Sequence, residues 1–203
     1  MADKLRLQLA GLRFTIRANV LFGLMVAAVL LRSRYAERIR NDKKELLVSE
    51  PQYEIPPRAV PENDAGYLEK ITQAVFQAGF SWQVIRNKWP GFQHAFAEFD
   101  VDQVAAFTPV DVERLVEDKG IVRNGRKIEA TITNARICQE LIAEHGSFYN
   151  YLRTMDGQPY AKREKQFCKK FKFMGPMGAY FFFWSVGEDV PEYHEWRAQN
   201  ENK

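Results

Sequence analysis

The chain has 203 residues, 46% of them hydrophobic and 13% aromatic, which is enough apolar material to bury a sizeable core. This composition excludes disorder over most of the length and fits one domain, or one domain with an extension. The net charge of +3 is unevenly distributed, because residues 1–45 hold ten Lys and Arg against four Asp and Glu. The remainder holds 19 basic and 22 acidic residues, so any anion-binding surface there must be local.

The N-terminal segment, residues 1–48, is predicted to be a basic and apolar helical extension. Its centre, "ANVLFGLMVAAVLL" (residues 18–31), is uncharged and is flanked by Arg17 and Arg32. This run is shorter than the roughly twenty residues of a bilayer span, and no small-residue cleavage site follows it. The sequence leaves two interpretations open. The segment is an amphipathic or buried helix, or it is a membrane anchor or organelle-targeting segment that contacts a membrane through residues 18–31.

Residues 49–64 are predicted to form a linker, because four of the nine prolines of the chain fall within them. The chain beyond is predicted to form one domain over 65–190, followed by a polar tail over 191–203. The two cysteines, Cys138 and Cys168, make neither a disulfide framework nor a metal-binding CxxC pattern, which suits a reducing compartment.

Apolar spacing and capping residues predict helices over nearly the whole domain, with no strand alternation. The predicted helices are, in chain order, 66–77, 82–88, 90–99, 101–107, one from Pro109 to Gly120, one through 128–142 that ends at Gly146, and 148–152. Ser81, Asp100, Thr108 and Ser147 are the expected N-caps, and Pro90 is expected to end a helix. We therefore expect an all-α fold, an orthogonal helical bundle.

Two of these helices meet through "GIVRNGR", residues 120–126, whose two glycines enclose an apolar pair. An apolar pair packed between two helices, with backbone N–H groups facing outward at the second helix, is the arrangement of a helix–hairpin–helix, and such donors bind phosphate. Arg123, Arg126 and Lys127 would add positive charge along a DNA backbone without reading its sequence. An ordinary helical hairpin with solvated basic residues stays open as the alternative.

Over about residues 65–155 the chain resembles the DNA-3-methyladenine glycosylase I family of the helix–hairpin–helix superfamily. The resemblance rests on "QAGFSW" (77–82) and "DVERLVEDKGIVRNGRKIEATITNAR" (111–136), and it resumes in "FCKKFKFMGPMGAYFFFWSVG" (167–187). It implies a helical enzyme that acts as a monomer on double-stranded DNA. Such an enzyme flips a damaged base out of the duplex and hydrolyses its N-glycosidic bond, in the cytoplasm and close to the nucleoid.

The same resemblance implies a base pocket. Trp82 matches the family's pocket tryptophan, on which a cationic base such as 3-methyladenine would stack. From the residues alone, Trp82 is better explained as a core residue. Ala78 and Gly79 belong to the loop that faces the gap left by the flipped nucleotide. The other expected pocket residues are Gln77, Phe80 and Tyr180.

The expected contacts to the DNA backbone are Gly120, Arg123, Asn124, Gly125, Arg126, Lys127 and Lys172. Lys172 lies in the basic segment "AKREKQFCKKFKF" (161–173), which holds six Lys and Arg and one Glu. That segment would supply the local positive surface that an acidic domain needs. A solvated helix face is the alternative interpretation.

The chain departs from the family in two places. The position of the family's pocket glutamate is occupied by Ala74, so the catalytic residue stays unassigned. The family's zinc clip uses Cys and His near both ends, whereas no Cys or His precedes Tyr67 and "GEDVPEYHEW" offers only His194. We therefore predict no metal and no cofactor.

Three functions stay open at this point. The first is a zinc-free glycosylase that removes alkylated purines and so starts base excision repair. The second is a non-catalytic DNA- or lesion-binding relative, and the third is a membrane-attached interaction protein on a reused helical fold. Gln77, Trp82 and the hairpin favour the first, Ala74 favours the second, and residues 18–31 favour the third.

Overall fold

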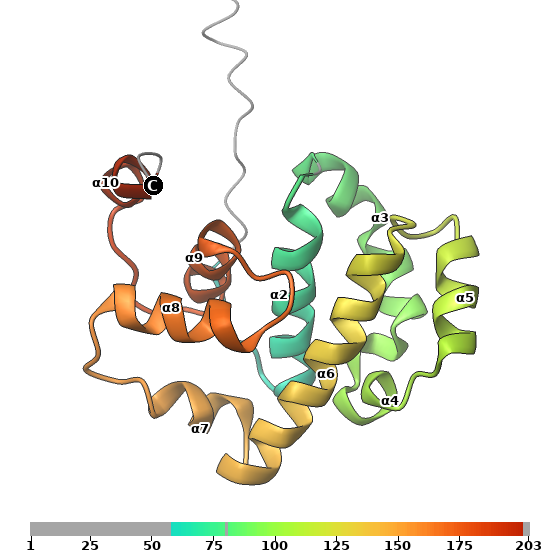
Figure 1. The fold of residues 1–203 in the computed structure, drawn as a ribbon, viewed down its shortest axis with the longest axis horizontal. Helices are drawn as coiled ribbons and strands as arrows, with labels where there is room; N and C mark the ends of the chain where they lie inside the picture. The colour runs from blue at the N-terminus through green and yellow to red at the C-terminus, as the bar shows by residue number, and fades with distance from the viewer. Residues whose placement is uncertain (1–57, 80, 201–203) are drawn as a thin grey trace, which may run out of the picture. The chain divides into compact units, whose positions relative to one another are not determined.

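The computed structural model describes residues 58–79 and 81–200, so the predictions for residues 1–57 lie outside the described residues. Every regular element in the described ranges is a helix, which confirms the predicted all-α class (Figure 1). The elements are α2 (Asp64–Gln77), α3 (Trp82–Ala95), the 3₁₀ turn η1 (Ala97–Phe99), α4 (Val101–Ala105), α5 (Pro109–Glu117), α6 (Gly125–His145), α7 (Phe148–Arg153), α8 (Tyr160–Lys170), α9 (Pro176–Ser185) and α10 (Tyr193–Asn200). Among these helices, none is both long and apolar enough to cross a membrane.

The 21-residue helix α6 runs through the middle of the fold and packs against α2, α4, α5 and α7 (Figure 1). Its inner face carries Ile128, Ile132 and Leu141, and α2 contributes the fully buried Leu68 and Phe76. In Figure 1, α3, α4 and α5 lie on one side of the α2–α6 pair, and α7, α8, α9 and α10 lie on the other. The loop that follows α2 and the hairpin that precedes α6 therefore lie at the same end of the bundle.

The predicted caps position most helix ends. Asp100 accepts a hydrogen bond from the third residue of α4 at 2.9 Å, and Ser147 Oγ accepts one from the third residue of α7 at 3.1 Å. In front of α5, the backbone N–H and the hydroxyl of Thr108 both donate to Asp111 Oδ2 at 2.9 Å. These bonds hold the pKa of Asp111 below its usual value. Gly146 ends α6 in a left-handed conformation with φ of 84°, as its residue type predicts.

The predicted helix end before Pro90 is wrong. α3 continues through Pro90 to Ala95, and only the short 3₁₀ turn η1 follows it before α4. A proline inside a helix removes one backbone hydrogen bond. Two residues later, however, Phe92 is fully buried, and its ring stacks at 5.0 Å on that of Trp89. Core packing on both sides of the proline therefore holds the helix together.

The segment predicted as a polar tail, 191–203, contains α10 in its described part. Trp196 on this helix is 4% exposed, and its indole N–H donates to Glu164 Oε2 at 2.7 Å. Its ring lies 4.6 Å from the ring of Tyr180. One buried aromatic residue thus anchors α10 to α8 and α9, although the composition of the segment is polar.

An ion-pair cluster holds three segments of the C-terminal half together. Glu188, in the turn after α9, accepts hydrogen bonds from Arg153 on α7 and from Arg163 on α8. The guanidinium of Arg163 is buried and also donates to the backbone oxygen of Asp189. From the first described residue, Arg58 donates at 2.9 Å to a backbone oxygen of the same turn. The turn after α9 is therefore held mainly by charged side chains.

Replacing Glu188 with Gln should lower the free energy of unfolding by about 3 kcal/mol, because Arg163 would stay buried without its counter-charge. Urea denaturation of the full chain measures this loss. Asp156→Asn is the matched control, since Asp156 also pairs with Arg153, at 3.5 Å, but is exposed. That change should cost less than about 1 kcal/mol. Equal losses in the two variants would show that burial of the Glu188 cluster contributes nothing extra.

Candidate functional site

Three of the predicted site residues form the loop between α2 and α3. Ala78 and Gly79 are exposed, whereas Phe80 lies outside the described residues. Gly79 has φ of +80°, and no atom lies within 4 Å of a Cβ built on it. The backbone turn, and not crowding, therefore requires glycine at this position. This is the physical reason for the interruption between the two helices.

Gln77 and Trp82 flank this loop. Gln77 is the last residue of α2, and Trp82 is the first residue of α3. Trp82 is partly buried and packs against the main core, so one part of its surface is covered and another stays accessible. The predicted N-cap, Ser81, occupies its expected position, but its hydroxyl makes no capping bond. The roles of Gln77 and Trp82 in binding a base stay predictions.

Ala74 lies one turn before the end of α2, and its surroundings are apolar. It is buried and faces the start of α9. A methyl group built on Gly178 would lie 3.8 Å from the Cβ of Ala74 and 3.0 Å from the sulfur of Met174. A longer side chain at position 74 would thus meet a glycine and a flexible thioether.

The structure does not bring Tyr180 to this place, which corrects its prediction as a pocket wall. Tyr180 follows Gly178 by two residues on α9, a rotation of about 200° around the helix, so it points to the opposite side. Its hydroxyl donates to the backbone oxygen of Pro191 at 2.9 Å. Its ring packs against Trp196 in the small core between α9 and α10. Tyr180 is therefore a core residue.

The hairpin between α5 and α6 packs its apolar pair as the sequence predicts. Ile121 is buried and Val122 is partly buried, so the apolar pair packs inward. The hairpin approaches α3 very closely at Gly91, because a Cβ there would lie 2.9 Å from the carbonyl carbon of Gly120. Lys88 on α3 adds a bond of 2.6 Å to the backbone oxygen of Lys119.

Of the hairpin backbone donors, the Gly120 N–H is already used, since it donates to Asp118 Oδ1 at 2.7 Å. The outward-facing donors are instead those of the first turn of α6, which begins at Gly125. The first N–H groups of a helix have no partner inside the helix, and the helix dipole makes this end attractive to anions. Asn124 caps the turn, because its side chain accepts from the N–H of Lys127 at 3.2 Å.

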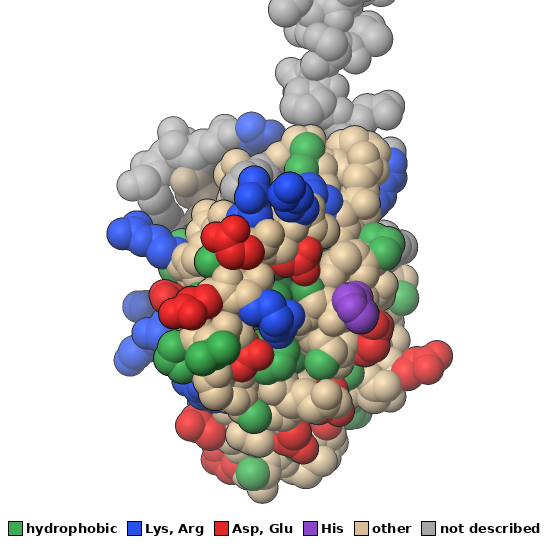
Figure 2. Space-filling model, turned by 90° about the vertical axis from the view of Figure 1, so that its right-hand side faces the viewer, with side chains coloured by type: hydrophobic (Ala, Val, Ile, Leu, Met, Phe, Trp, Pro, Cys, Tyr) green, Lys and Arg blue, Asp and Glu red, His purple; other side chains and the backbone are tan. Residues whose placement is uncertain are grey.

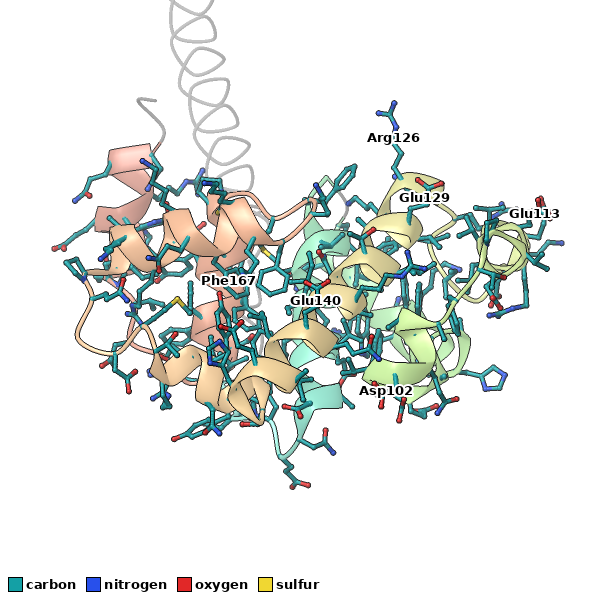
Figure 3. All side chains as sticks on the ribbon, turned by 60° about the horizontal axis from the view of Figure 1, so that its bottom comes forward. Asp102, Glu113, Arg126, Glu129, Glu140 and Phe167 are labelled. Carbon is teal, nitrogen blue, oxygen red and sulfur yellow. The ribbon has the colours of Figure 1, made fainter. Side chains whose placement is uncertain are left out.

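Three of the cations predicted to contact DNA are exposed. Arg123 and Arg126 are exposed, and so is Lys172 in the turn after α8. Figure 2, which views the α5 side of the molecule, shows Lys and Arg side chains close together in its upper part and acidic side chains mostly below. Figure 3 shows Arg126 extending away from the start of α6. In the same basic segment as Lys172, Arg163 is buried against Glu188 and adds nothing to this surface.

The prediction that Lys127 contacts the DNA backbone is corrected. Lys127 is 5% exposed, and its ammonium donates to the backbone oxygens of Phe76, at 3.3 Å, and of Ala78. Burial lowers the pKa of its side chain. Its position three residues into α6 turns it inward, to the end of α2, whereas its neighbour Arg126 points out.

The sequence did not predict a polar clamp, a pair of hydrogen bonds from one side chain to the main chain, that fixes the turn after α8. The buried Asn134 on α6 donates to the backbone oxygen of Lys172 at 3.1 Å and accepts from its N–H at 2.8 Å. The next residue, Phe173, has a positive φ of 56° and is 51% exposed. An asparagine on the apolar face of a predicted helix was the one available signal of this clamp.

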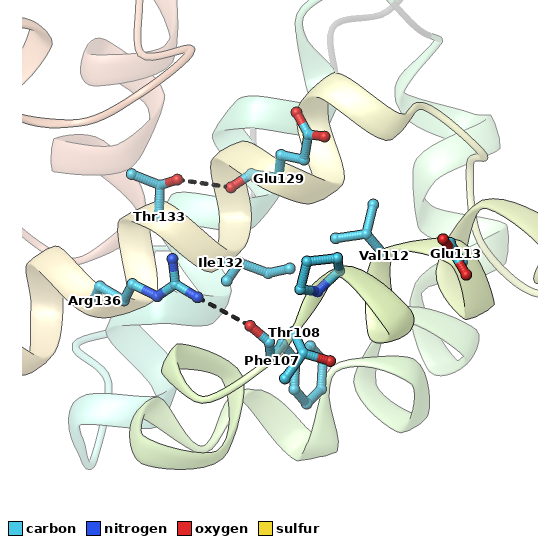
Figure 4. A pocket seen from close by; sticks show the side chains of 9 residues that line it. Phe107, Thr108, Val112, Glu113, Glu129, Ile132, Thr133 and Arg136 are labelled. Atoms are coloured by element: carbon cyan, nitrogen blue, oxygen red, sulfur yellow. Dashed lines mark hydrogen bonds between the residues drawn. The ribbon is translucent and has the colours of Figure 1, made fainter.

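A second feature that the sequence did not predict is a pocket of about 490 Å³ between α5 and α6 (Figure 4). Its lining includes the apolar side chains of Phe107, Val112 and Ile132 and the acidic side chains of Glu113 and Glu129. It lies on the flank of the two hairpin helices. In the described part of the chain, no three His, Cys, Asp or Glu side chains are grouped to hold a metal ion.

Comparison with known proteins gives a consistent match. A family model described as methyladenine glycosylase matches residues 58–169. The chain is 46% identical to DNA-3-methyladenine glycosylase 1 of Escherichia coli over 78 residues, which are 38% of this chain and only 42% of that protein. It is 29% identical to DNA-3-methyladenine glycosylase of Haemophilus influenzae over 147 residues, with 63% of this chain and 80% of that protein covered.

The fold gives the same result. A crystal structure of a 3-methyladenine DNA glycosylase I matches with a TM-score of 0.55 and 32% identity, over 63% of this chain and 81% of that chain. A solution structure of a 3-methyladenine DNA glycosylase I matches with a TM-score of 0.54 and 30% identity, over 64% and 81% of the two chains. The family model covers more than half of the chain and includes both the loop after α2 and the hairpin before α6. The chain therefore belongs to the methyladenine glycosylase family.

Proposed function

We propose that this protein is a DNA glycosylase that flips an alkylated purine, of the 3-methyladenine kind, out of duplex DNA and hydrolyses its N-glycosidic bond. The observation that carries the proposal is the placement of the loop after α2 and the hairpin before α6 at one end of the bundle, joined through Lys127. A duplex held by its phosphates at Arg123 and Arg126 would present its base stack to Ala78 and Gly79.

Trp82 is the residue best suited to hold the flipped base. An alkylated adenine is cationic, and stacking on an indole gains about 1–2 kcal/mol from cation–π attraction when water is excluded. The accessible part of Trp82 lies directly after the loop, where an extruded base would arrive. Stacking of this kind selects flat cations over neutral bases.

Hydrolysis of the N-glycosidic bond of an alkylated base needs few further groups from the protein. Water oxygen adds to C1′ of the sugar as the bond from C1′ to the base nitrogen breaks, and the base keeps the bonding electron pair. The positively charged base therefore leaves neutral, and a proton of the water passes to solvent. Normal bases leave badly and need protonation, but an alkylated base does not. With Ala74 in place of the family's glutamate, a hydrogen-bond acceptor that would recognise the base is missing. The N-glycosidic bond can still break.

A non-catalytic lesion-binding protein is the second candidate, and the apolar surroundings of Ala74 favour it. The experiment that separates the two is a base-release assay. Full-length protein is incubated with methylated DNA, and the free bases are quantified by chromatography. Release of 3-methyladenine above the spontaneous rate supports the glycosylase. Binding to methylated DNA without any release supports the second candidate.

Trp82→Ala should lower the rate of alkylated-base release by about tenfold or more, because a loss of about 1.4 kcal/mol of transition-state stabilisation corresponds to that factor. Affinity for undamaged duplex should stay nearly unchanged, because the hairpin is intact. Trp82→Phe, which keeps a flat ring, should retain an intermediate rate. If the folded Trp82→Ala variant releases base at the parental rate, Trp82 serves only the core and the proposed pocket is misplaced.

Ala74→Glu should raise the release of 3-methyladenine several-fold, because a carboxylate would accept hydrogen bonds from the cationic base. Room for it comes from Gly178, which has no side chain, and from the flexible Met174. Ala74→Gln is the matched control, since it has nearly the same size without the charge. Reduced release by both variants would mean that position 74 belongs to a closed core.

Replacing Arg123 and Arg126 together with Ala should weaken binding to methylated and unmodified duplexes equally. The slope of log K against log salt should fall by about two, since each lost phosphate contact contributes about 0.9. Fluorescence anisotropy at several salt concentrations measures both quantities. Arg114→Ala is the control and should change neither, because the Arg114 guanidinium pairs with Asp111 at 3.4 Å within α5. Unchanged affinity and slope in the double variant would remove the hairpin from the DNA interface.

A further inference from the structure

One buried cation connects the two surfaces that the proposed function uses. The ammonium of Lys127 reaches the backbone oxygens of Phe76 and Ala78, which are about fifty positions earlier in the chain. Phe76 is in the last turn of α2, and Ala78 is the first residue of the loop. The ammonium also lies 5.7 Å from the centre of the Phe76 ring.

The backbone of Lys127 belongs to the hairpin. Its N–H donates to both oxygens of Asn124, at 3.0 Å to the backbone oxygen and 3.2 Å to the side chain. Asn124 is flanked by Arg123 and by the first turn of α6, where the exposed Arg126 lies. A single residue therefore holds the cap of the hairpin at its main chain and the end of α2 at its side chain.

If position 127 served packing alone, a buried lysine would be less favourable than an apolar side chain. Burying an ammonium costs free energy that an apolar side chain of similar length would not cost, and the lowered pKa reflects this cost. The compensation comes from carbonyl groups at a helix C-terminus, which lack partners within the helix and carry the negative end of its dipole. The arrangement fixes the direction in which α2 ends and the loop begins.

We propose that Lys127 is a positioning residue, which couples phosphate binding at the hairpin to the insertion of Ala78 and Gly79 into the gap left by a flipped base. The inference rests on the proposed function, since it assigns the loop to that gap. Movement of the hairpin along the DNA backbone moves the cap at Asn124. Because the Lys127 ammonium donates to the backbone oxygen of Ala78, a displacement of the cap also displaces Ala78. The displacement is transmitted by this hydrogen bond and not by flexible surface side chains.

The test compares two duplexes that differ in a single nucleotide. One is intact, and the other contains a stable tetrahydrofuran abasic-site analogue, which provides the vacated stack without chemistry. The parental protein should bind the abasic duplex more tightly. Lys127→Met, which has similar length and no donors, should keep its affinity for the intact duplex within about twofold, yet lose about fivefold in its preference for the abasic duplex, which is a typical effect for a residue that couples two sites.

Lys88→Met is the matched control, because Lys88 donates its ammonium to a hairpin carbonyl, that of Lys119, whereas Lys127 donates to the end of α2. It should lower the stability and keep the preference for the abasic duplex. A purely structural role for Lys127 would make the two variants behave alike. If Lys127→Met does not fold, Lys127→Gln, which keeps an amide donor, should show a smaller loss of preference.

An unchanged preference in a folded Lys127 variant overturns the proposal. Equal affinity of the parent for the two duplexes also overturns it, because the loop would then not respond to a vacated stack. Base release is measured separately on methylated DNA. If the parent prefers the abasic duplex but releases no base, the proposed catalytic function fails, and the comparison of variants still decides the role of Lys127.

Discussion

The burial of α6 across the centre of the bundle is the constraint on which the candidate site depends. Three polar side chains along this helix each bind the main chain of a different segment. Lys127 holds the end of α2, Asn134 holds the turn after α8, and Arg136 donates to the backbone oxygens of Ala105 and Phe107 at 2.9 Å each. Main-chain atoms do not depend on the residue type that carries them. The helix therefore sets where these segments lie, and their side chains are left to vary.

Much of this fold can be predicted from sequence because its helix ends depend on local interactions. Asp100, Thr108, Ser147 and Gly146 act on residues within one turn of themselves, so the residue types report the geometry directly. The inward packing of Ile121 follows in the same way from an apolar pair between two glycines. These signals need no knowledge of what lies elsewhere in the chain.

The parts that sequence did not predict depend on partners far along the chain. Lys127 has the same residue type as an exposed phosphate contact, and only the carbonyls of α2 show that it points inward. Tyr180 was assigned to a pocket by resemblance, but the aromatic partner that buries it lies on α10. A proline usually ends a helix, but at Pro90 the burial of the neighbouring Phe92 outweighs the lost backbone hydrogen bond. In each case tertiary packing overrides the local preference.

The contact between Gly91 and Gly120 has a consequence for how this protein tolerates change. The obstacle that any side chain at position 91 would meet is the peptide group of Gly120, which belongs to the main chain. A side-chain clash can be relieved by a smaller neighbour, but no second substitution can shrink a peptide group. Variation at position 91 would therefore require α3 and the hairpin to separate. Libraries that diversify Trp82 and the hairpin should keep Gly91 constant, since it sets the spacing between the two.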